Sequence, residues 1–387
     1  MGVYTAYMIK FVVAFLGLLG GLSLASADSY LAPVGPHSEP FPVSIWTHEI
    51  VTSGGLMNDI ELDALDNPHV VFVETARDML RYGHRQDDVW SVMDLAPFPD
   101  AVPESELAFD MAVDPVAAMP VVAYVNSEEN KLYVGRLLPS GWQWELLEDE
   151  GGRLLSLQID SAGRTHLVYV SDQIIHYVTR ITGAWEEELI GEPDNYIWNL
   201  SLDLDAANRP HIATTGANGS FYAVRIGPND WETDFLPVSD LDNIEGLAID
   251  SDGRPHFLVT ESEIVFGRPP FARVRLSLVE RVGNEWRFVP LWQDYDWYIY
   301  SRLLADDDGT LHVLFYDTAT RAHYMTQRPG GQLYRDRPFG VIEGQVSMAL
   351  DSEGRPHLLH ASGPNLIYSR QIYEIHDELI YGALAFN

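Results

Sequence analysis

The sequence has no cysteine and almost no lysine. Without cysteine there can be no disulfide, no thiol catalysis, no cysteine-based zinc site and no lipidated N-terminal cysteine. Only Lys10 and Lys131 are lysines among the 24 basic residues, and 57 acidic residues bring the formal net charge to −33. Nucleic acids and anionic membranes are bound by cationic surfaces, so this composition argues strongly against both as partners. The acidity by itself indicates high solubility.

Long hydrophobic runs are also missing, except for one near the N-terminus. Phe11–Leu24 is apolar, follows Lys10 and precedes Ala25-Ser26-Ala27, the small-x-small pattern of a signal-peptidase site. The run is shorter than the roughly 20 residues that a membrane-spanning helix needs. We therefore predict that residues 1–27 are a signal peptide and that the mature chain is secreted or periplasmic, without membrane insertion. An uncleaved anchor is the alternative.

One sequence motif recurs along the rest of the chain. An alternating apolar segment ends in aspartate, a turn follows, and six residues after the aspartate a histidine opens the next segment. These histidines are His69, His166, His211, His256, His312 and His357. A diverged copy at 111–125 has Pro120 at the histidine position, and counting it the copies recur about every 45 residues.

Each unit holds four short segments with strand-like alternation. After the histidine segment comes one in which tyrosine recurs, and then one led by tryptophan, with Tyr334 in the tryptophan position of the sixth unit. Four strands repeated at this period predict an all-β fold, a seven-bladed β-propeller with four-stranded antiparallel blades. The seventh unit lacks its last strand, and Trp46–Val51 matches that strand, so we expect an N-terminal strand to close the ring.

The predicted organisation follows from these boundaries. A lead-in at residues 28–43 precedes the propeller at 44–371, and residues 372–387 form a C-terminal extension. With units of the form D-x-x-G-x-P-H followed by a tyrosine strand and a tryptophan strand, the chain resembles the seven-bladed repeat propellers of secreted bacterial proteins. Sialidases share this broad class, but their Asp box (S-x-D-x-G-x-x-W) and arginine motif are missing here. The resemblance implies a fold and not an activity.

The repeated aspartates and histidines are predicted to be structural. A residue present in almost every blade is a poor candidate for a single active site, and a hydrogen bond across the hairpin accounts for the pair. Two turns, at Asp250–Gly253 and Asp306–Gly309, are similar to calcium loops but lack the full ligand pattern. No metal or cofactor is therefore predicted, with calcium as the alternative.

Function is expected where the repeats differ. The position four residues before each repeat aspartate is small in four units and charged in three, at Asp59, Asp110 and Arg302. If these side chains meet at the mouth of a central channel, the carboxyls can act as acid and base and the arginine can bind an anion. The alternative is that they pair with one another or cap strand ends.

Aromatic residues gather in two of the irregular loops. Such rings stack on sugar faces or grip a protein partner. The candidate ligand-binding residues are Tyr196, Trp198, Trp292, Trp297, Tyr298 and Tyr300.

Two functions remain open from the sequence. The first is an exported propeller that binds a glycan or a protein, or serves as a scaffold, through its irregular loop face. The alternative is a glycan-active enzyme, a polysaccharide lyase or glycoside hydrolase at the channel mouth, with His48, His323 or His360 available as a base beside Arg302.

Overall fold

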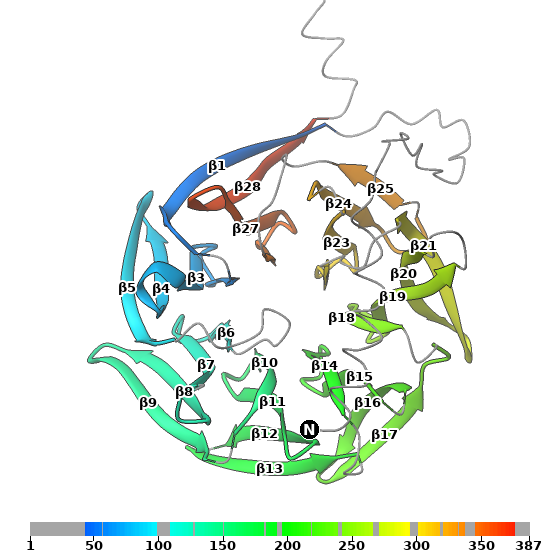
Figure 1. Ribbon diagram of the computed structural model, residues 1–387, viewed down its shortest axis with the longest axis horizontal. Helices are drawn as coiled ribbons and strands as arrows, with labels where there is room; N and C mark the ends of the chain where they lie inside the picture. The colour runs from blue at the N-terminus through cyan, green and yellow to red at the C-terminus, as the bar shows by residue number, and fades with distance from the viewer. Residues whose placement is uncertain are drawn as a thin grey trace, which may run out of the picture.

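The computed structural model describes residues 43–375 except 56, 99–108, 127, 150, 182, 192–195, 218, 239–241, 266–270, 295–300, 318–319, 332 and 337–344. The predicted signal peptide lies outside these residues, as do Trp297, Tyr298 and Tyr300. Within them no helix is long and apolar enough to cross a membrane. The described chain is all-β, and its sheets are arranged in a ring (Figure 1).

Seven antiparallel sheets of four strands form the seven blades of a β-propeller. Blade 1 contains β2 (Asn58–Leu62), β3 (Pro68–Glu74), the 3-10 turn η1 (Thr75–Arg77), β4 (Met79–Gln86) and β5 (Val89–Pro97). Blade 2 contains β6 (Phe109–Val113), β7 (Pro120–Asn126), β8 (Lys131–Leu138) and β9 (Gly141–Glu148). Blade 3 contains β10 (Arg153–Ile159), β11 (Thr165–Ser171), β12 (Ile174–Ile181) and β13 (Ala184–Ile190).

The remaining blades repeat this order. Blade 4 contains β14 (Ile197–Leu204), β15 (Pro210–Gly216), β16 (Gly219–Gly227) and β17 (Asp230–Phe235). Blade 5 contains β18 (Asn243–Ile249), β19 (Pro255–Val265), β20 (Phe271–Val282) and β21 (Glu285–Asp294). Blade 6 contains β22 (Ser301–Ala305), β23 (Leu311–Tyr316), β24 (Ala322–Gln327) and β25 (Leu333–Asp336). Blade 7 contains β26 (Val346–Leu350), β27 (Pro356–Ser362), β28 (Asn365–Ile375) and β1 (Val43–Ser53).

The seventh sheet joins the two ends of the described chain. β1 is its outer strand and pairs antiparallel with β28, from Val43 opposite Ile375 to Ser53 opposite Asn365 (Figure 1). β1 begins one residue before the predicted propeller start at 44, and β28 ends four residues after the predicted propeller end at 371.

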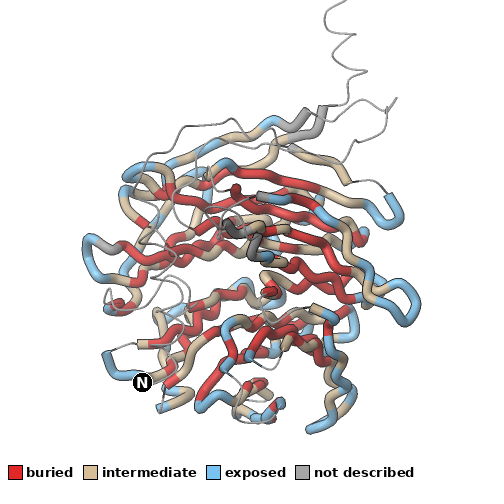
Figure 2. Tube along the Cα trace, turned by 45° about the vertical axis from the view of Figure 1, so that its right-hand side comes forward, coloured by how far each residue is buried: buried red, intermediate tan, exposed pale blue. Residues whose placement is uncertain are grey.

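The core lies between neighbouring blades. The second strand of each blade is almost wholly buried, as in β3, β11 and β15. Figure 2 shows buried residues along the middle of the blades and exposed ones at the turns. Tryptophans of the outer strands pack edge-on against tyrosines of the preceding blade, with ring centroids 5.3 Å apart for Trp142 on Tyr82 and 5.2 Å for Trp231 on Tyr177. Such pairs contribute about 1 kcal/mol beyond the area that they bury.

The strand register corrects the expected place of Pro120. Pro120 opens β7 as prolines open β3 and β15, and the histidine position belongs to Val121. Val121 pairs with Arg136 just as His69 pairs with His84. The turn of this blade is one residue longer than the others. Six residues after Asp114 the sequence therefore reaches Pro120, and the histidine position is the next residue, Val121.

A second correction concerns the tryptophan position of blade 6. Leu333, opposite Gln327, takes the place that Trp231 has opposite Arg225, so Tyr334 is not the equivalent residue. Leu333 packs against the core cluster that includes Leu278, which stands in blade 5 where other blades have tyrosine. Blades 5 and 6 have thus replaced the tyrosine–tryptophan contact with two leucines.

Candidate functional site

The ring has two faces that differ in composition. The turn face carries the turns between the first and second strands, which begin at the repeat aspartates; Asp114 is the equivalent in blade 2. The loop face is the opposite one, where each first strand begins and each second strand ends. Figure 1 shows first strands such as β6, β10, β14 and β18 nearest the centre of the ring.

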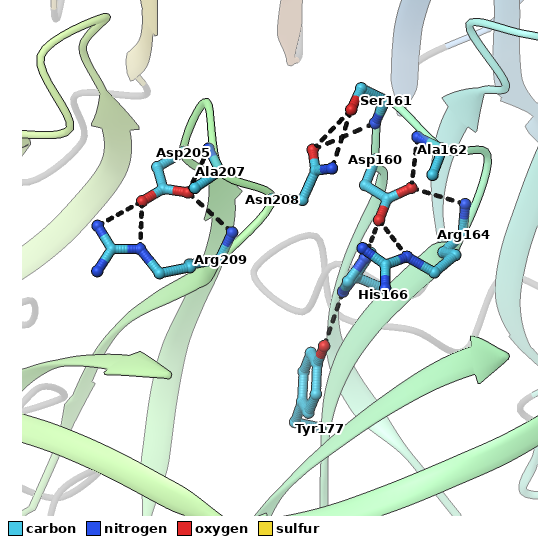
Figure 3. Close-up of polar contacts among 10 residues, drawn as sticks. All are labelled: Asp160, Ser161, Ala162, Arg164, His166, Tyr177, Asp205, Ala207, Asn208 and Arg209. Atoms are coloured by element: carbon cyan, nitrogen blue, oxygen red, sulfur yellow. Dashed lines mark hydrogen bonds and ion pairs between the residues drawn. The ribbon is translucent and has the colours of Figure 1, made fainter. Parts of the chain in front are cut away.

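Each turn on the turn face closes around its aspartate, as Asp160 in blade 3 illustrates. One carboxylate oxygen accepts the backbone N–H groups of Ala162 (2.9 Å) and Arg164 (2.8 Å). The other accepts Nε–H of Arg164 (2.5 Å) and lies 3.3 Å from Nε2 of His166, whose Nδ1 lies 2.7 Å from the hydroxyl of Tyr177 (Figure 3). The carboxylate requires the proton on Nε2, so Nδ1 accepts from the tyrosine.

An Asp–His–Tyr chain occurs in five blades, in which Nε2 of the histidine lies 3.2 to 3.8 Å from the aspartate carboxylate. The histidine-to-tyrosine distances are 2.5 to 2.7 Å in the pairs His69–Tyr82, His166–Tyr177, His211–Tyr222, His312–Tyr324 and His357–Tyr368. All six repeat histidines are buried. Burial lowers the pKa of His69 to about 4, and it is also the largest cause of the lowered pKa values of His166, His211, His312 and His357.

Two blades depart from this chain. Blade 2 has Val121 and Val134 where the others have histidine and tyrosine, so both polar partners are lost together. In blade 5, His256 lies 3.0 Å from Asp250, but Leu278 replaces the tyrosine and Nδ1 of His256 has no hydrogen-bond partner. The oxygens of Asp250 accept N–H groups from Asp252 and Arg254 and lie within 3.0 Å of Nε2 of His256. Within the described chain no three acidic or histidine side chains gather as a metal site would require.

The predicted ligand residue Trp292 lies in the core, and this prediction is corrected. Its side chain is 8% exposed. The ring centroids of Trp292 and His323 are 4.8 Å apart, and the guanidinium of Arg335 lies 4.5 Å from a ring centroid of Trp292. His323 is itself buried and bonded to Asp317 (3.0 Å), in a second copy of the aspartate turn at the loop face of blade 6. This histidine is therefore enclosed and cannot reach a substrate as a base.

The other histidines considered as bases, His48 and His360, share one partner. Nδ1 of His48 lies 2.8 Å and Nε2 of His360 lies 3.2 Å from the hydroxyl of Ser369. This links β1, β28 and β27 within blade 7. Burial lowers the pKa of His360 to about 4, so this side chain is a weak base.

Tyr196 and Trp198 form an exposed aromatic pair on the loop face. Each is 37% exposed, and their ring centroids are 6.3 Å apart. Strand pairing passes from Ile197 to Asn199, so Trp198 occupies a β-bulge in β14. A bulge turns a side chain out of the regular alternation, which explains how a tryptophan beside the buried Ile197 reaches solvent.

Arg153 extends this pair from the neighbouring blade. It begins β10, and its guanidinium lies 4.7 Å from the centroid of the Tyr196 ring. Its Nη1 donates to the carbonyl oxygen of Ile197 at 2.5 Å, which fixes the guanidinium across the seam between blades 3 and 4. We name Arg153, Tyr196 and Trp198 the aromatic platform. Arg153 was not identified from the sequence, although its distance from Ile197, 44 residues, is close to one repeat and marks a contact between blades.

Asp59 and Asp110 lie side by side near the axis of the ring. Their carboxyl groups are hydrogen-bonded to each other, and Arg302 acts on Asp59 electrostatically. Each also holds the next blade, because Asp59 accepts the backbone N–H of Met111 (3.1 Å) and Asp110 that of Leu157 (2.6 Å). These N–H groups lie on the inner edge of a sheet, where no further strand can pair with them. The structure thus places Asp59 beside Asp110, with Arg302 near enough to act on Asp59, and gives both carboxyls contacts between blades.

Three further carboxyls near the axis were not anticipated, namely Glu61, Asp203 and Glu245. Burial raises the pKa of Glu61 and Glu245, and it raises the pKa of Asp203 to about 6 despite hydrogen bonds from the backbone of Ile249 and Leu204. Burial and the neighbouring Asp59 raise the pKa of Asp110 well above its ordinary value. Hydrogen bonding between Asp59 and Asp110 therefore depends on a proton held by Asp110.

Comparison with known proteins supports the fold. No protein-family model and no curated protein matches the chain. An ulvan lyase, a polysaccharide lyase solved bound to -[GlcA(1-4)Rha3S]-, is similar at 11% identity over 85% of this chain and 95% of that one, with a TM-score of 0.53. The β-propeller domain of the Trilobed protease from Pyrococcus furiosus is similar at 10% identity over 88% and 95%, with a TM-score of 0.50. A lectin from Burkholderia pseudomallei has 15% identity over 82% and 90%, with a TM-score of 0.47.

Proposed function

We propose that this protein is an exported binding propeller that recognises a glycan on the aromatic platform of its loop face. The observation that carries the proposal is the exposed pair Tyr196 and Trp198, held outward by a β-bulge. Aromatic rings offer apolar area at low entropic cost, and the C–H faces of sugars stack on them.

Stacking requires rings that are both exposed and fixed. Ile197, which lies between Tyr196 and Trp198 in the sequence, is buried and anchors the segment. The Tyr196 carbonyl oxygen accepts the backbone N–H of Ala217 (2.9 Å). Arg153 lies over the Tyr196 ring from the other side of the blade seam. A surface fixed in this way loses little conformational freedom when a ligand binds.

A glycan-active enzyme is the second candidate, and the axial carboxyls favour it. Two adjacent carboxyls with different pKa values can serve as acid and base, and the pKa of Asp110 is raised well above that of an ordinary aspartate. The hydrogen bonds that both groups accept from the next blade give them a structural task, so we place this function second. Degradation of acidic polysaccharides by the mature protein, lost in Asp110→Asn, would establish it.

A glycan array with the mature protein tests binding, followed by titration calorimetry on the best saccharide. We expect Trp198→Ala to weaken binding at least about tenfold, because a ring–sugar contact contributes of the order of 1–2 kcal/mol. The matched control is Phe235→Ala, which removes a ring that is 68% exposed at the end of β17 in the same blade. Equal losses in the two variants, or no saccharide bound by the wild type, contradict the proposal.

A further inference from the structure

Arg153 is one of several arginines of the described chain that form no ion pair with a described carboxylate, and it lies against the exposed pair Tyr196 and Trp198. Acidic residues outnumber basic ones by 57 to 24, and the turn arginines Arg164, Arg209, Arg254 and Arg355 each form an ion pair with the aspartate four residues before them. Arg153 forms no ion pair with any carboxylate of the described chain. Its contacts are the Tyr196 ring and the Ile197 carbonyl oxygen.

These contacts orient the guanidinium without neutralising it. An arginine has five N–H donors, and the bond to Ile197 uses one of them. A guanidinium that lies over an aromatic ring keeps its edge directed outward, and that edge matches two oxygens of a carboxylate or sulfate group. The half-buried position of Arg153 weakens the competition from water.

We propose that the saccharide bound on the aromatic platform is anionic and that its carboxylate or sulfate group pairs with Arg153. This inference rests on the proposed function and names the class of its ligand. Trp198 and Tyr196 supply stacking that any sugar of suitable shape can use, and Arg153 supplies the discrimination between charged and neutral sugars. The net charge of −33 repels anions at long range, so selection for them must come from this local contact.

The test uses saccharides that differ only in charge. Oligosaccharides of glucuronic acid are compared with the same chains after reduction of the carboxyls to hydroxymethyl groups, and a sulfated galactan with its desulfated form. We expect the wild type to bind at least one anionic form about tenfold or more tightly than its neutral partner, as a charge-assisted pair of hydrogen bonds implies. The pair with the larger ratio shows whether a carboxylate or a sulfate is recognised.

Two variants connect this ratio to Arg153. Arg153→Gln keeps a donor for the Ile197 carbonyl oxygen and should reduce the ratio to about one while neutral saccharides bind as before; Arg153→Lys should restore only part of it. Arg287→Gln is the control, because it removes an exposed arginine that pairs with Glu280 on the outer edge of blade 5, and it should leave the ratio unchanged. Near-ultraviolet circular dichroism confirms that the variants are folded.

The outcomes separate this inference from the proposed function. Equal affinity for charged and neutral partners, or an equal loss in Arg287→Gln, overturns the role of Arg153 while leaving glycan binding intact. Failure of every saccharide to bind, or undiminished binding in Trp198→Ala, overturns both.

Discussion

The turn face and the loop face of this propeller satisfy their polar groups in opposite ways. On the turn face Asp160 has four donors within hydrogen-bond distance, and three equivalent hydrogen bonds from Ala207 and Arg209 return at Asp205 in the next blade. On the loop face Arg153 lacks a described carboxylate partner, and two aromatic rings of blade 4 stay exposed. The aspartates that recur from blade to blade close turns within their own blades, whereas Arg153, Tyr196 and Trp198 occur at one seam and are available for a ligand.

The largest effect on stability is expected from a turn aspartate. Asp160→Ala leaves buried donors of Arg164 and His166 without an acceptor, so we expect it to lower the free energy of unfolding by about 3 kcal/mol. Urea denaturation measures this change. The control Asp252→Ala removes an exposed carboxylate of the equivalent turn in blade 5 and should leave the unfolding midpoint unchanged. If Asp160→Ala and Asp252→Ala lowered the free energy of unfolding equally, burial of the turn carboxylate would not explain its contribution to stability.

Asp203 and Asp205 flank Leu204 at the end of β14, and their contributions to the free energy of unfolding should change with pH in opposite directions. Burial raises the pKa of Asp203 to about 6, so the folded protein holds more protons than the unfolded chain, and stability falls as pH rises from about 4 to about 6. Asp203→Asn removes this loss, but its single amide oxygen keeps only one of the two backbone N–H bonds, because Leu204 and Ile249 donate to different carboxylate oxygens. We expect the effect of this variant on the free energy of unfolding to be more favourable at pH 8 than at pH 4 by about 1–2 kcal/mol.

The matched partner is Asp205→Asn. Although burial acts to raise the pKa of Asp205, hydrogen bonds from the backbone and guanidinium of Arg209 lower it overall. Its charge therefore stabilises the fold above the ordinary aspartate pKa, and this stabilisation is lost as pH falls below about 4. Asp205→Asn should destabilise at pH 8, with a penalty that shrinks on acidification. Unfolding curves at pH 4 and pH 8 that change in the same direction for both variants contradict the account.

A smaller effect is expected at the inner end of the Asp–His–Tyr chain. Tyr177→Phe removes the hydroxyl that donates to His166 and should cost about 1 kcal/mol, the net contribution of one buried hydrogen bond. Tyr133→Phe is the control, because its hydroxyl bonds to Glu129 at the surface, and its unfolding midpoint should equal that of the wild type. A Tyr177→Phe protein as stable as the wild type would show that the chain contributes nothing to stability.

The repeat period made the propeller predictable from the sequence, because every blade has the same alternating strands and aspartate turns. The equivalences at Pro120 and Tyr334 failed for local reasons. One extra turn residue moves the histidine position of blade 2 by one, and in blade 6 a leucine occupies the tryptophan position next to Tyr334. Trp292 could not be assigned to the core from spacing alone, since its burial depends on Arg335 and His323, which lie in other strands.

The candidate site was predictable only in part. Tyr196 and Trp198 were visible as aromatic residues in an irregular loop, but their partner Arg153 lies in the preceding blade and meets them only when the ring has formed. Asp59, Asp110 and Arg302 were visible as breaks in a series of small residues. The bonds of the two aspartates to the backbone of the next blade depend on how blades are packed, which the pattern within one repeat does not contain.

The most direct test measures affinity and stability together in Trp198→Ala and Asp160→Ala. The account predicts that Trp198→Ala raises the dissociation constant for the bound saccharide at least about tenfold while the free energy of unfolding stays within about 0.5 kcal/mol of the wild type. Asp160→Ala should show the reverse, a large loss of stability with unchanged affinity of the folded protein. If affinity and stability change together in either variant, the separation of a structural turn face from a binding loop face is wrong.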